Sequence, residues 1–167
     1  MRRSVPSAFL WVFLLWLLLL RSTGICIAGE YQVSRVVDGD TIILNNGTSK
    51  ITIRLAGIDA PEISHAKHEP GQPFSQQSTK HLAGLILNQS VDIISYGNDR
   101  YGRILGEVFL DGTNVNLAMV KAGLAEVYSG TPAKGQNMDL YWRAEEAAKR
   151  AGKGIWVLGD KYVSPRE

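Results

Sequence analysis

The residues of this sequence that could do chemistry lie at or near the ends of predicted β-strands. Asp40 follows a glycine, Arg54 belongs to a stretch of alternating apolar and polar residues, and Asp59 and Glu62 flank Pro61. Strand ends converge on one rim of a small barrel, so we expect these charged side chains to face a common region. Carboxylates and a guanidinium gathered in one place indicate a site for a metal ion and a phosphate group.

The candidate metal ligands are all oxygen atoms. Asp40 and Asp59 supply the carboxylates that Ca²⁺ and Mg²⁺ prefer, whereas the scarcity of thiols and of paired histidines argues against zinc. Pro61 biases Ala60 toward an extended conformation, so the Ala60 carbonyl could be a third ligand. These residues are consistent with a calcium site, and they do not separate calcium from magnesium.

Arg54 and Arg103 could supply the second half of a phosphoryl-transfer site. A phosphodiester attacked by water accumulates negative charge on its non-bridging oxygens, and a guanidinium pairs with those oxygens at any working pH. Glu62 can act as the general base or orient the attacking water. Taken together, these groups indicate hydrolysis of phosphodiester bonds.

The surrounding pattern predicts a small β-barrel wrapped by helices. Period-two alternation over residues 33–55, broken by an Asn-Gly turn, indicates a β-meander. Further strands are predicted over 91–94 and 103–110, and residues 124–128 could return as a short strand. Helices are predicted over 74–88, from Asn114 to Gly123, and over 139–150. The fold class is therefore α+β, mainly β, with a five-stranded barrel of the oligonucleotide-binding (OB) type and three helices.

The last predicted helix should pack against the barrel. We expect Leu140, Ala144, Ala147 and Ala148 to face inward, and Trp142 and Trp156 to be core or helix-packing aromatics.

The first 28 residues differ from the rest of the chain. They hold Arg2, Arg3 and Arg21 but no acidic residue, and residues 8–20 are uninterruptedly apolar. As a helix this run is roughly 20 Å long, short of a hydrocarbon core of about 30 Å, and small residues follow it up to Ala28. We therefore predict a signal peptide at 1–28, a single domain at 29–167, and a secreted or periplasmic location. The alternative is a membrane anchor formed by residues 8–27.

Residues 29–167 carry no net positive charge with which to attract nucleic acid. They contain 15 Lys and Arg against 16 Asp and Glu, so any binding of phosphate must be local. The only cysteine, Cys26, lies in the predicted signal peptide. A cysteine nucleophile, a thiolate zinc site and a disulfide are therefore excluded from the predicted mature domain.

Four segments together resemble the staphylococcal nuclease (thermonuclease) family in order, spacing and placement on strands. They are Asp38-Gly39-Asp40-Thr41, residues 54–62 (RLAGIDAPE), Tyr101-Gly102-Arg103 and Gly154-Ile155-Trp156. The resemblance covers residues 31–156. It implies an OB-fold nuclease that hydrolyses DNA and RNA with calcium and little sequence specificity, giving 3′-phosphate ends.

The resemblance also implies a role for each matching residue. The implied calcium ligands are Asp40, Asp59 and the Ala60 carbonyl; the implied catalytic residues are Arg54 and Arg103 on the phosphate and Glu62 on the attacking water; Asp38 and Thr41 support the ion; and Tyr101 and Tyr128 contact nucleotide, Tyr128 as a stacking surface. The founding member has threonine where this chain has Ala60. That change keeps a main-chain ligand and removes a hydroxyl near the ion, which bears on metal affinity rather than reaction class.

Each of these residues also has an ordinary structural explanation. Asp38-Gly39-Asp40 has the composition of a turn, and Asp59, Glu62 and Arg54 could be solvated charges or a weak surface ion pair. Their joint occurrence in the family pattern favours an active site.

Two other functions stay open. One is a catalytically inactive nucleic-acid-binding module, which predicts damaged site positions, and the other is a membrane-tethered surface protein. We expect a monomer with DNA and RNA as substrates and no protein partner, which contacts a membrane only if the N-terminal segment is retained.

Overall fold

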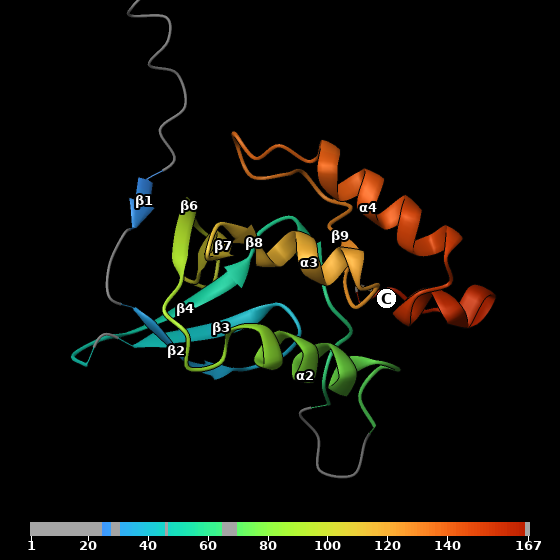
Figure 1. The fold of residues 1–167 in the computed structure, drawn as a ribbon, viewed down its shortest axis with the longest axis horizontal. Helices are drawn as coiled ribbons and strands as arrows, with labels where there is room; N and C mark the ends of the chain where they lie inside the picture. Colours follow the sequence, from blue (N-terminus) through green and yellow to red (C-terminus); the bar gives the residue numbers. More distant parts are fainter. Residues whose placement is uncertain (1–24, 28–30, 46, 65–69, 166–167) are drawn as a thin grey trace, which may run out of the picture.

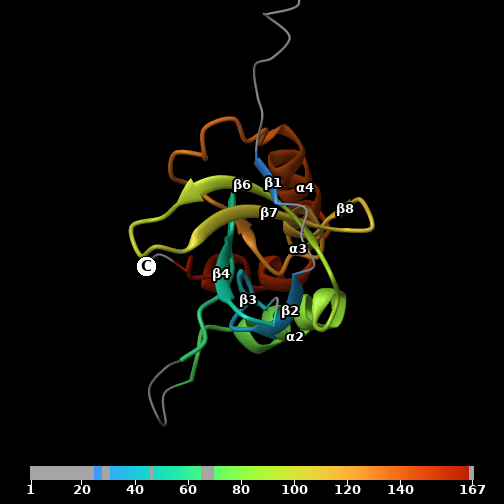
Figure 2. The same ribbon diagram turned by 90° about the vertical axis from the view of Figure 1, so that its left-hand side faces the viewer.

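The computed structural model describes residues 25–27, 31–45, 47–64 and 70–165. A curved β-sheet forms the centre, and helices lie around it (Figure 1). The helices are α2 (Ser75–Ile86), α3 (Val115–Lys121), α4 (Asp139–Arg150) and a 3-10 helix, η1 (Gly154–Lys161). In both ribbon views α2 lies below the sheet and α4 above it, and α3 packs against both (Figure 2).

The main sheet follows the order β1-β6-β7-β4-β3-β2, and β8 pairs with β7. Its strands are β1 (Ile25–Ile27), β2 (Gln32–Val36), β3 (Thr41–Asn45), β4 (Lys50–Leu55), β6 (Asp92–Asn98), β7 (Ile104–Leu110) and β8 (Thr113–Asn114). Neighbouring strands are antiparallel except β4 and β7, which are parallel, with Arg54 opposite Leu105. A separate pair joins β5 (Ile58–Asp59) to β9 (Glu126–Val127).

Strand β2 also bonds the segment that leads into β6. The Val33 N–H donates to the Gln89 carbonyl at 2.9 Å, and the Asn88 N–H donates to the Val33 carbonyl at 2.8 Å. A bridge between Gln32 and Ser90 continues this contact. The segment that leads into β6 therefore bonds back to β2, the first strand of the path β2-β3-β4-β7-β6. The predicted α+β fold of the OB type is confirmed.

The helices begin and end close to where the sequence predicts them. Helix α4 spans the predicted residues, and α2 is shorter than predicted by one residue at its start and two at its end. The Asn114 side chain accepts a hydrogen bond from the Leu117 N–H at 2.9 Å, which confirms it as the N-cap of α3. Strand β5 and helix η1 were not predicted, because two residues show no periodicity and η1 is interrupted at Gly159, where φ is 54°.

Two of the four residues predicted to face inward on α4, Leu140 and Ala147, are exposed. Leu140 and Trp142 are 58% and 54% exposed, whereas Tyr141 is 2% exposed. Ala144 and Ala148 complete the buried stripe with Tyr141. The prediction of an inward Leu140 and a packed Trp142 was wrong, because the Tyr141 hydroxyl has a buried hydrogen-bond partner and can therefore enter the core. Trp156 is half-buried and its ring centroid lies 5.1 Å from that of Tyr162.

Most of the predicted N-terminal segment lies outside the described residues. Residues 1–24 and 28–30 are not described, so the signal peptide at 1–28 and the alternative anchor at 8–27 stay predictions. Strand β1, inside that segment, pairs with the edge of β6. In the part of the chain that the structure describes, no helix has the length and apolar character needed to cross a membrane.

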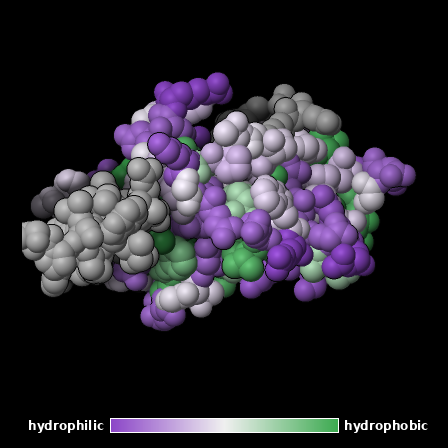
Figure 3. Space-filling model, turned by 90° about the horizontal axis from the view of Figure 1, so that it is seen from above, coloured by the Kyte–Doolittle hydropathy of each residue, from purple (hydrophilic) through white to green (hydrophobic). Residues whose placement is uncertain are grey.

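The face of the molecule that is seen from above is mainly hydrophilic (Figure 3).

Candidate active site

A tight turn between β2 and β3 places Asp40 at the rim of the barrel. Asp38 Oδ1 accepts a hydrogen bond from the Asp40 N–H at 3.0 Å. A Cβ atom at Gly39 would lie 2.0 Å from Ser78 Oγ and 2.5 Å from the Ala60 Cβ, so only glycine fits between these neighbours. The turn therefore presses the backbone of residue 39 against α2 and leaves Asp40 beside Ala60.

The carboxylate of Asp40 is held through both of its oxygens. Thr41 donates its hydroxyl to Asp40 Oδ1 at 3.1 Å, and the Ala60 N–H donates to Asp40 Oδ2 at 2.7 Å. Asp38 and Thr41 were predicted to support the site, and the structure places both in contact with Asp40. Their effect on a bound ion stays a prediction.

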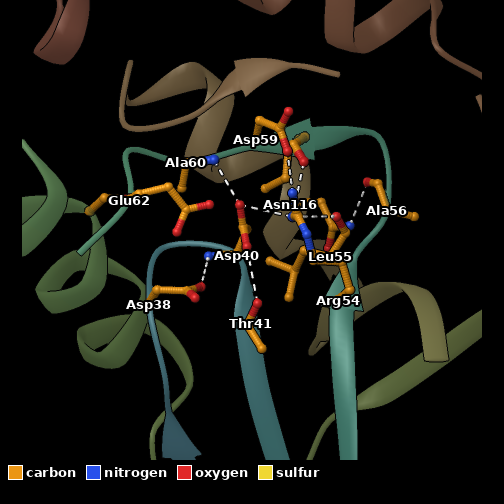
Figure 4. A network of polar contacts seen from close by, with 12 residues as sticks. Asp38, Asp40, Thr41, Arg54, Leu55, Ala56, Asp59, Ala60, Glu62 and Asn116 are labelled. Atoms are coloured by element: carbon orange, nitrogen blue, oxygen red, sulfur yellow. Dashed lines mark hydrogen bonds and ion pairs between the residues drawn. The ribbon is translucent and has the colours of Figure 1, made fainter. Parts of the chain in front are cut away.

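Arg54 joins the two central carboxylates (Figure 4). Its Nη1 lies 2.8 Å from Asp40 Oδ2, and its Nη2 forms an ion pair and hydrogen bond with Asp59 Oδ1. Nη1 also donates to the Ile58 carbonyl at 3.0 Å. Asp40 and Asp59 are 5% and 6% exposed, so this cluster is largely removed from solvent. The carboxylates from the β2–β3 turn and from β5 therefore converge on one positive group.

The cluster has a shortage of positive charge. Burial raises the pKa of Asp40 to about 8, although Arg54 lowers it and the Ala60 N–H also lowers it. Asp38 and Asp59 raise it further through their own negative charge. Burial disfavours the charged form of Arg54, but Asp40 and Asp59 outweigh burial and raise the Arg54 pKa. One guanidinium is thus insufficient compensation for the acidic residues around it.

This donor set fits an oxygen-preferring divalent cation. Asp40 and Asp59 offer carboxylate oxygens that already share one cationic partner, and an added positive charge would favour the ionised form of Asp40. Among the described residues there is no group of three or more His, Cys, Asp or Glu side chains that could hold a metal ion. Further ligands must come from backbone or water, as predicted for the Ala60 carbonyl, although the contact seen at Ala60 is made by its N–H.

Arg103 lies in the same hollow as Arg54. This hollow has a volume of about 470 Å³, and its lining includes Arg54, Asp99, Arg100, Tyr101, Arg103 and Tyr128. The Arg103 Nε donates to Asp99 Oδ2 at 2.7 Å. The two predicted phosphate-binding arginines therefore face one space, one from the end of β4 and the other from the turn before β7.

Asp99 also lines this hollow, and the sequence did not predict it as a site residue. Its Oδ1 accepts hydrogen bonds from the N–H groups of Tyr101 and Arg103, both at 2.9 Å. Burial acts to raise the Asp99 pKa, but the hydrogen bonds from Arg103 and Tyr101 outweigh it and hold the pKa below its usual value. An Asp four residues before Arg103, at the start of a Gly-containing turn, was the available signal.

The two predicted nucleotide-contacting tyrosines also lie on the hollow. Tyr101 is 68% exposed and Tyr128 is 40% exposed. The guanidinium carbons of Arg100 and Arg103 lie 4.8 Å and 5.4 Å from the centroid of the Tyr101 ring. Exposed rings beside guanidinium groups can stack a base while its phosphate is bound. The roles of Tyr101 and Tyr128 stay predictions.

Glu62 lies beyond β5 on the exposed side of the cluster. Its side chain points toward Asp40 (Figure 4). The Glu62 N–H donates to Gln72 Oε1 at 2.8 Å, and the Gln72 N–H donates to the Glu62 carbonyl at 2.9 Å. The sequence reading missed Gln72, because a glutamine in a Pro- and Gly-rich loop gives no pattern that connects it to a residue ten positions away.

Asn116 is a third residue that the sequence did not predict, and it lies between β7 and the segment that follows Arg54. It is fully buried, and its Nδ2 donates to the carbonyls of Ala56 at 2.9 Å and Gly106 at 3.0 Å. Its Oδ1 accepts from the Val108 N–H at 3.0 Å. This amide ties the segment after Arg54 to β7. An asparagine inside the apolar stretch of α3 was the signal.

The sequence is similar to a nuclease family model and to proteins named as endonucleases. Residues 52–157 match the family model described as staphylococcal nuclease homologue. The chain is 41% identical over 130 residues to "Probable endonuclease LCL3" of Paracoccidioides lutzii, covering 70% of this chain and 37% of that protein. It is 38% identical over 127 residues to an "Uncharacterized endonuclease" of Haemophilus influenzae, covering 75% of this chain and 65% of that protein. The chain therefore spans well under half of the fungal relative and about two thirds of the bacterial one.

Proposed function

Because this chain belongs to the staphylococcal nuclease homologue family, we propose that it is a calcium-dependent nuclease of DNA and RNA. It would hydrolyse phosphodiester bonds with little sequence specificity and leave 3′-phosphate ends. One observation carries the proposal: Arg54 and Arg103 line a single hollow whose inner wall adjoins the carboxylates of Asp40 and Asp59. A phosphate in that hollow would meet two guanidinium groups next to a cluster that lacks positive charge.

The two arginines would act at different stages of the reaction. Arg103 is 32% exposed in its side chain and can reach a phosphate from the open side, whereas Arg54 is 14% exposed and is bound by Asp40 and Asp59. Arg54 would stabilise the non-bridging oxygens from its present position as their negative charge grows. Its restrained position makes it a preorganised donor, which needs little rearrangement in the transition state.

Glu62 would take a proton from the attacking water or orient that water. Its exposed position and its direction toward Asp40 place a carboxylate on the solvent side of the cluster. Asp40, Asp59 and the Ala60 carbonyl would hold calcium. When bound, calcium would neutralise negative charge on the phosphate and favour ionisation of a nearby water.

A metal series on the purified protein tests the proposal. Single- and double-stranded DNA and RNA should be degraded with Ca²⁺ and protected by a chelator, and end-labelled products should carry 3′-phosphate groups. Products with 5′-phosphate ends, or activity that persists with chelator, would contradict the assigned chemistry. Binding of nucleic acid without cleavage in every metal would favour the alternative of an inactive binding module.

We also propose that the N-terminal segment directs secretion or a periplasmic location, with cleavage near Ala28. The supporting observation is the charged, apolar and small-residue order of residues 1–28. The intact mass of the exported protein separates cleavage from retention as an anchor.

A further inference from the structure

One glutamine connects Glu62 to the C-terminal end of the chain. Two hydrogen bonds join Gln72 to the backbone of Glu62, one through the Gln72 side-chain oxygen and one through its N–H. The remaining polar atom of that side chain, Nε2, donates to the Ser164 carbonyl at 3.2 Å. Gln72 therefore binds both backbone polar groups of Glu62 and is itself held by a residue 92 positions away.

The two ends of the loop that carries Glu62 are in close contact. A Cβ atom at Gly71 would lie 2.9 Å from the Glu62 carbonyl oxygen and 2.9 Å from the Ser64 nitrogen. Real Cβ atoms do not approach backbone atoms so closely, so glycine is required for this packing. Gly71 thereby lets Gln72 come within hydrogen-bonding distance of Glu62.

The C-terminal segment, residues 162–164, is anchored on a buried carboxylate. Glu126 is 9% exposed and accepts hydrogen bonds from the hydroxyls of Tyr162 at 2.8 Å and Ser164 at 2.6 Å. In the β5–β9 pair Glu126 lies directly opposite Asp59. The C-terminal segment therefore bridges two parts of the candidate site, the strand that pairs with Asp59 and the loop that carries Glu62.

We propose that Gln72 is a positioning residue for Glu62, and that the C-terminal segment holds Gln72 in its working orientation. The inference rests on the proposed role of Glu62 in the reaction. The position of a side chain depends on the backbone that carries it, so holding the Glu62 backbone through both of its polar groups restricts where the carboxylate can lie. A displacement of about 1 Å at such a group can reduce turnover about 100-fold.

Two substitutions of Gln72 separate its two contacts. Gln72→Ala removes both side-chain bonds and should lower kcat by about 10-fold to 100-fold, with KM and calcium affinity near their native values. Gln72→Glu keeps an acceptor for the Glu62 N–H but loses the donor to Ser164, so the loss should be about 5-fold. Gln77→Ala, an exposed glutamine on α2, is the matched control and should have native kinetics.

A double-mutant cycle distinguishes positioning from general loosening of the fold. If Gln72 acts through Glu62, Gln72→Ala should cause little further loss in a protein that already carries Glu62→Gln. Multiplied losses in the double variant would overturn the assignment. An equal loss of calcium affinity and turnover in Gln72→Ala would also overturn it, because the defect would then extend to the metal ligands.

Truncation tests the contribution of the C-terminal segment. A chain that ends at Val163 lacks the Ser164 carbonyl and hydroxyl and should lose turnover to about the same extent as Gln72→Glu. A chain that ends at Pro165 keeps both groups and is its control. Native turnover in both Gln72→Glu and the shorter chain would show that the segment does not act on the site. If the shorter chain fails to fold, Gln72→Glu alone decides.

An activity-independent measurement separates this inference from the proposed function. Hydrogen exchange at the Glu62 amide should accelerate about 10-fold or more in Gln72→Ala and measurably in the chain that ends at Val163. If exchange is faster in the variants but the native protein cleaves no nucleic acid, the coupling is kept and the proposed function is rejected. Unchanged exchange in both variants would reject the coupling whatever the activity.

Discussion

Two buried carboxylate clusters of this protein are built in opposite ways. At the rim, Asp40 and Asp59 face one guanidinium, and the pKa of Asp40 is raised by burial. Between β7 and α4, Glu107 is 7% exposed and is surrounded by neutral donors. The first cluster gathers like charges that the fold alone leaves poorly compensated, whereas the second surrounds a single carboxylate with three neutral hydrogen-bond donors.

The Glu107 cluster connects four elements of the fold. Tyr96 donates its hydroxyl to Glu107 Oε2 at 2.6 Å, and Tyr141 donates to Oε1 at 2.5 Å. Asn114, the cap of α3, donates its Nδ2 to Oε1 at 3.2 Å. Burial, together with the Glu107 carboxylate, raises the pKa of both tyrosines, so their hydroxyls stay protonated donors over the ordinary pH range.

The contrast separates a structural use of buried charge from a functional one. Fully satisfied polar networks fix one packing arrangement, as Glu107 does between β6, β7 and α4. Incompletely compensated charge lowers stability and is retained where a ligand supplies the missing charge. The comparison therefore predicts that changes at the rim alter activity more than stability, and that changes around Glu107 do the reverse.

The largest expected effect is on catalysis at the rim. Arg103→Ala should reduce turnover by about 100-fold to 1,000-fold, because it removes one guanidinium from the charge that develops on the phosphate. The free energy of unfolding should change little, since Arg103 is partly exposed and pairs with Asp99 at the edge of the hollow. Single-turnover cleavage and chemical denaturation measure the two quantities. Near-native turnover would remove Arg103 from the reaction.

The next effect is a pH dependence of stability that originates at Asp40. The pKa of Asp40 is about 8 in the folded protein, compared with an unperturbed value of 3.8, so the folded state binds the proton more tightly. The resulting stabilisation is complete below about pH 4 and is lost as the pH rises through 8, with a slope of at most about 1.4 kcal/mol per pH unit. Without calcium, Asp40→Asn should therefore become progressively more stable than the native chain over this range.

Denaturation of both proteins between pH 4 and pH 9, with chelator, checks this expectation. Parallel stability curves would mean that Asp40 ionises normally in the folded protein. Added calcium should flatten the curve of the native chain, because a bound cation stabilises the ionised carboxylate.

A smaller and opposite effect is expected at the Glu107 cluster. Tyr141→Phe keeps the ring and removes the hydroxyl, so the buried Glu107 loses its closest donor and the free energy of unfolding should fall by about 1 to 3 kcal/mol. Turnover at saturating substrate should stay within about 2-fold, since Tyr141 does not line the hollow. Urea denaturation and the cleavage assay test both halves. A large loss of turnover without destabilisation would break the contrast between the clusters.

The smallest effect serves as a reference for ordinary surface charge. Arg150 pairs with Glu146 on α4 at 2.9 Å, and the two side chains are 67% and 61% exposed. Arg150→Ala should lower stability by no more than about 0.5 kcal/mol and leave turnover unchanged. A measured loss comparable to that of Tyr141→Phe would show that exposure is a poor guide to the energy of ion pairs in this protein.

The sequence predicts the charged residues at the rim of the barrel better than it predicts the residues that hold them in place. Asp40, Arg54, Asp59 and Glu62 lie within 23 consecutive residues, in turns and strands with a strong local pattern. Asn114 was predicted as a cap by the same kind of local signal. The family resemblance then connected these residues to Arg103, which composition and periodicity could not.

The missed contacts join residues that are far apart in the chain. Gln72 meets Ser164, and Asn116 meets Ala56, 60 positions away. Hydrogen bonds of this kind depend on how elements pack, and they leave no period in the sequence. The inward face of α4 was misjudged for the same reason, because the partner that lets Tyr141 enter the core is on β7.

The parallel pairing of β4 with β7 has a consequence for when the candidate site can form during synthesis of the chain. Arg54 is synthesised about fifty residues before Leu105, its neighbour across the two strands, so both arginines reach one hollow only after half of the domain has left the ribosome. A nascent chain that ends before residue 103 has the acidic turn and Arg54 but lacks the second arginine of the hollow. The topology thus delays assembly of the complete candidate site until the second half of the domain is being synthesised.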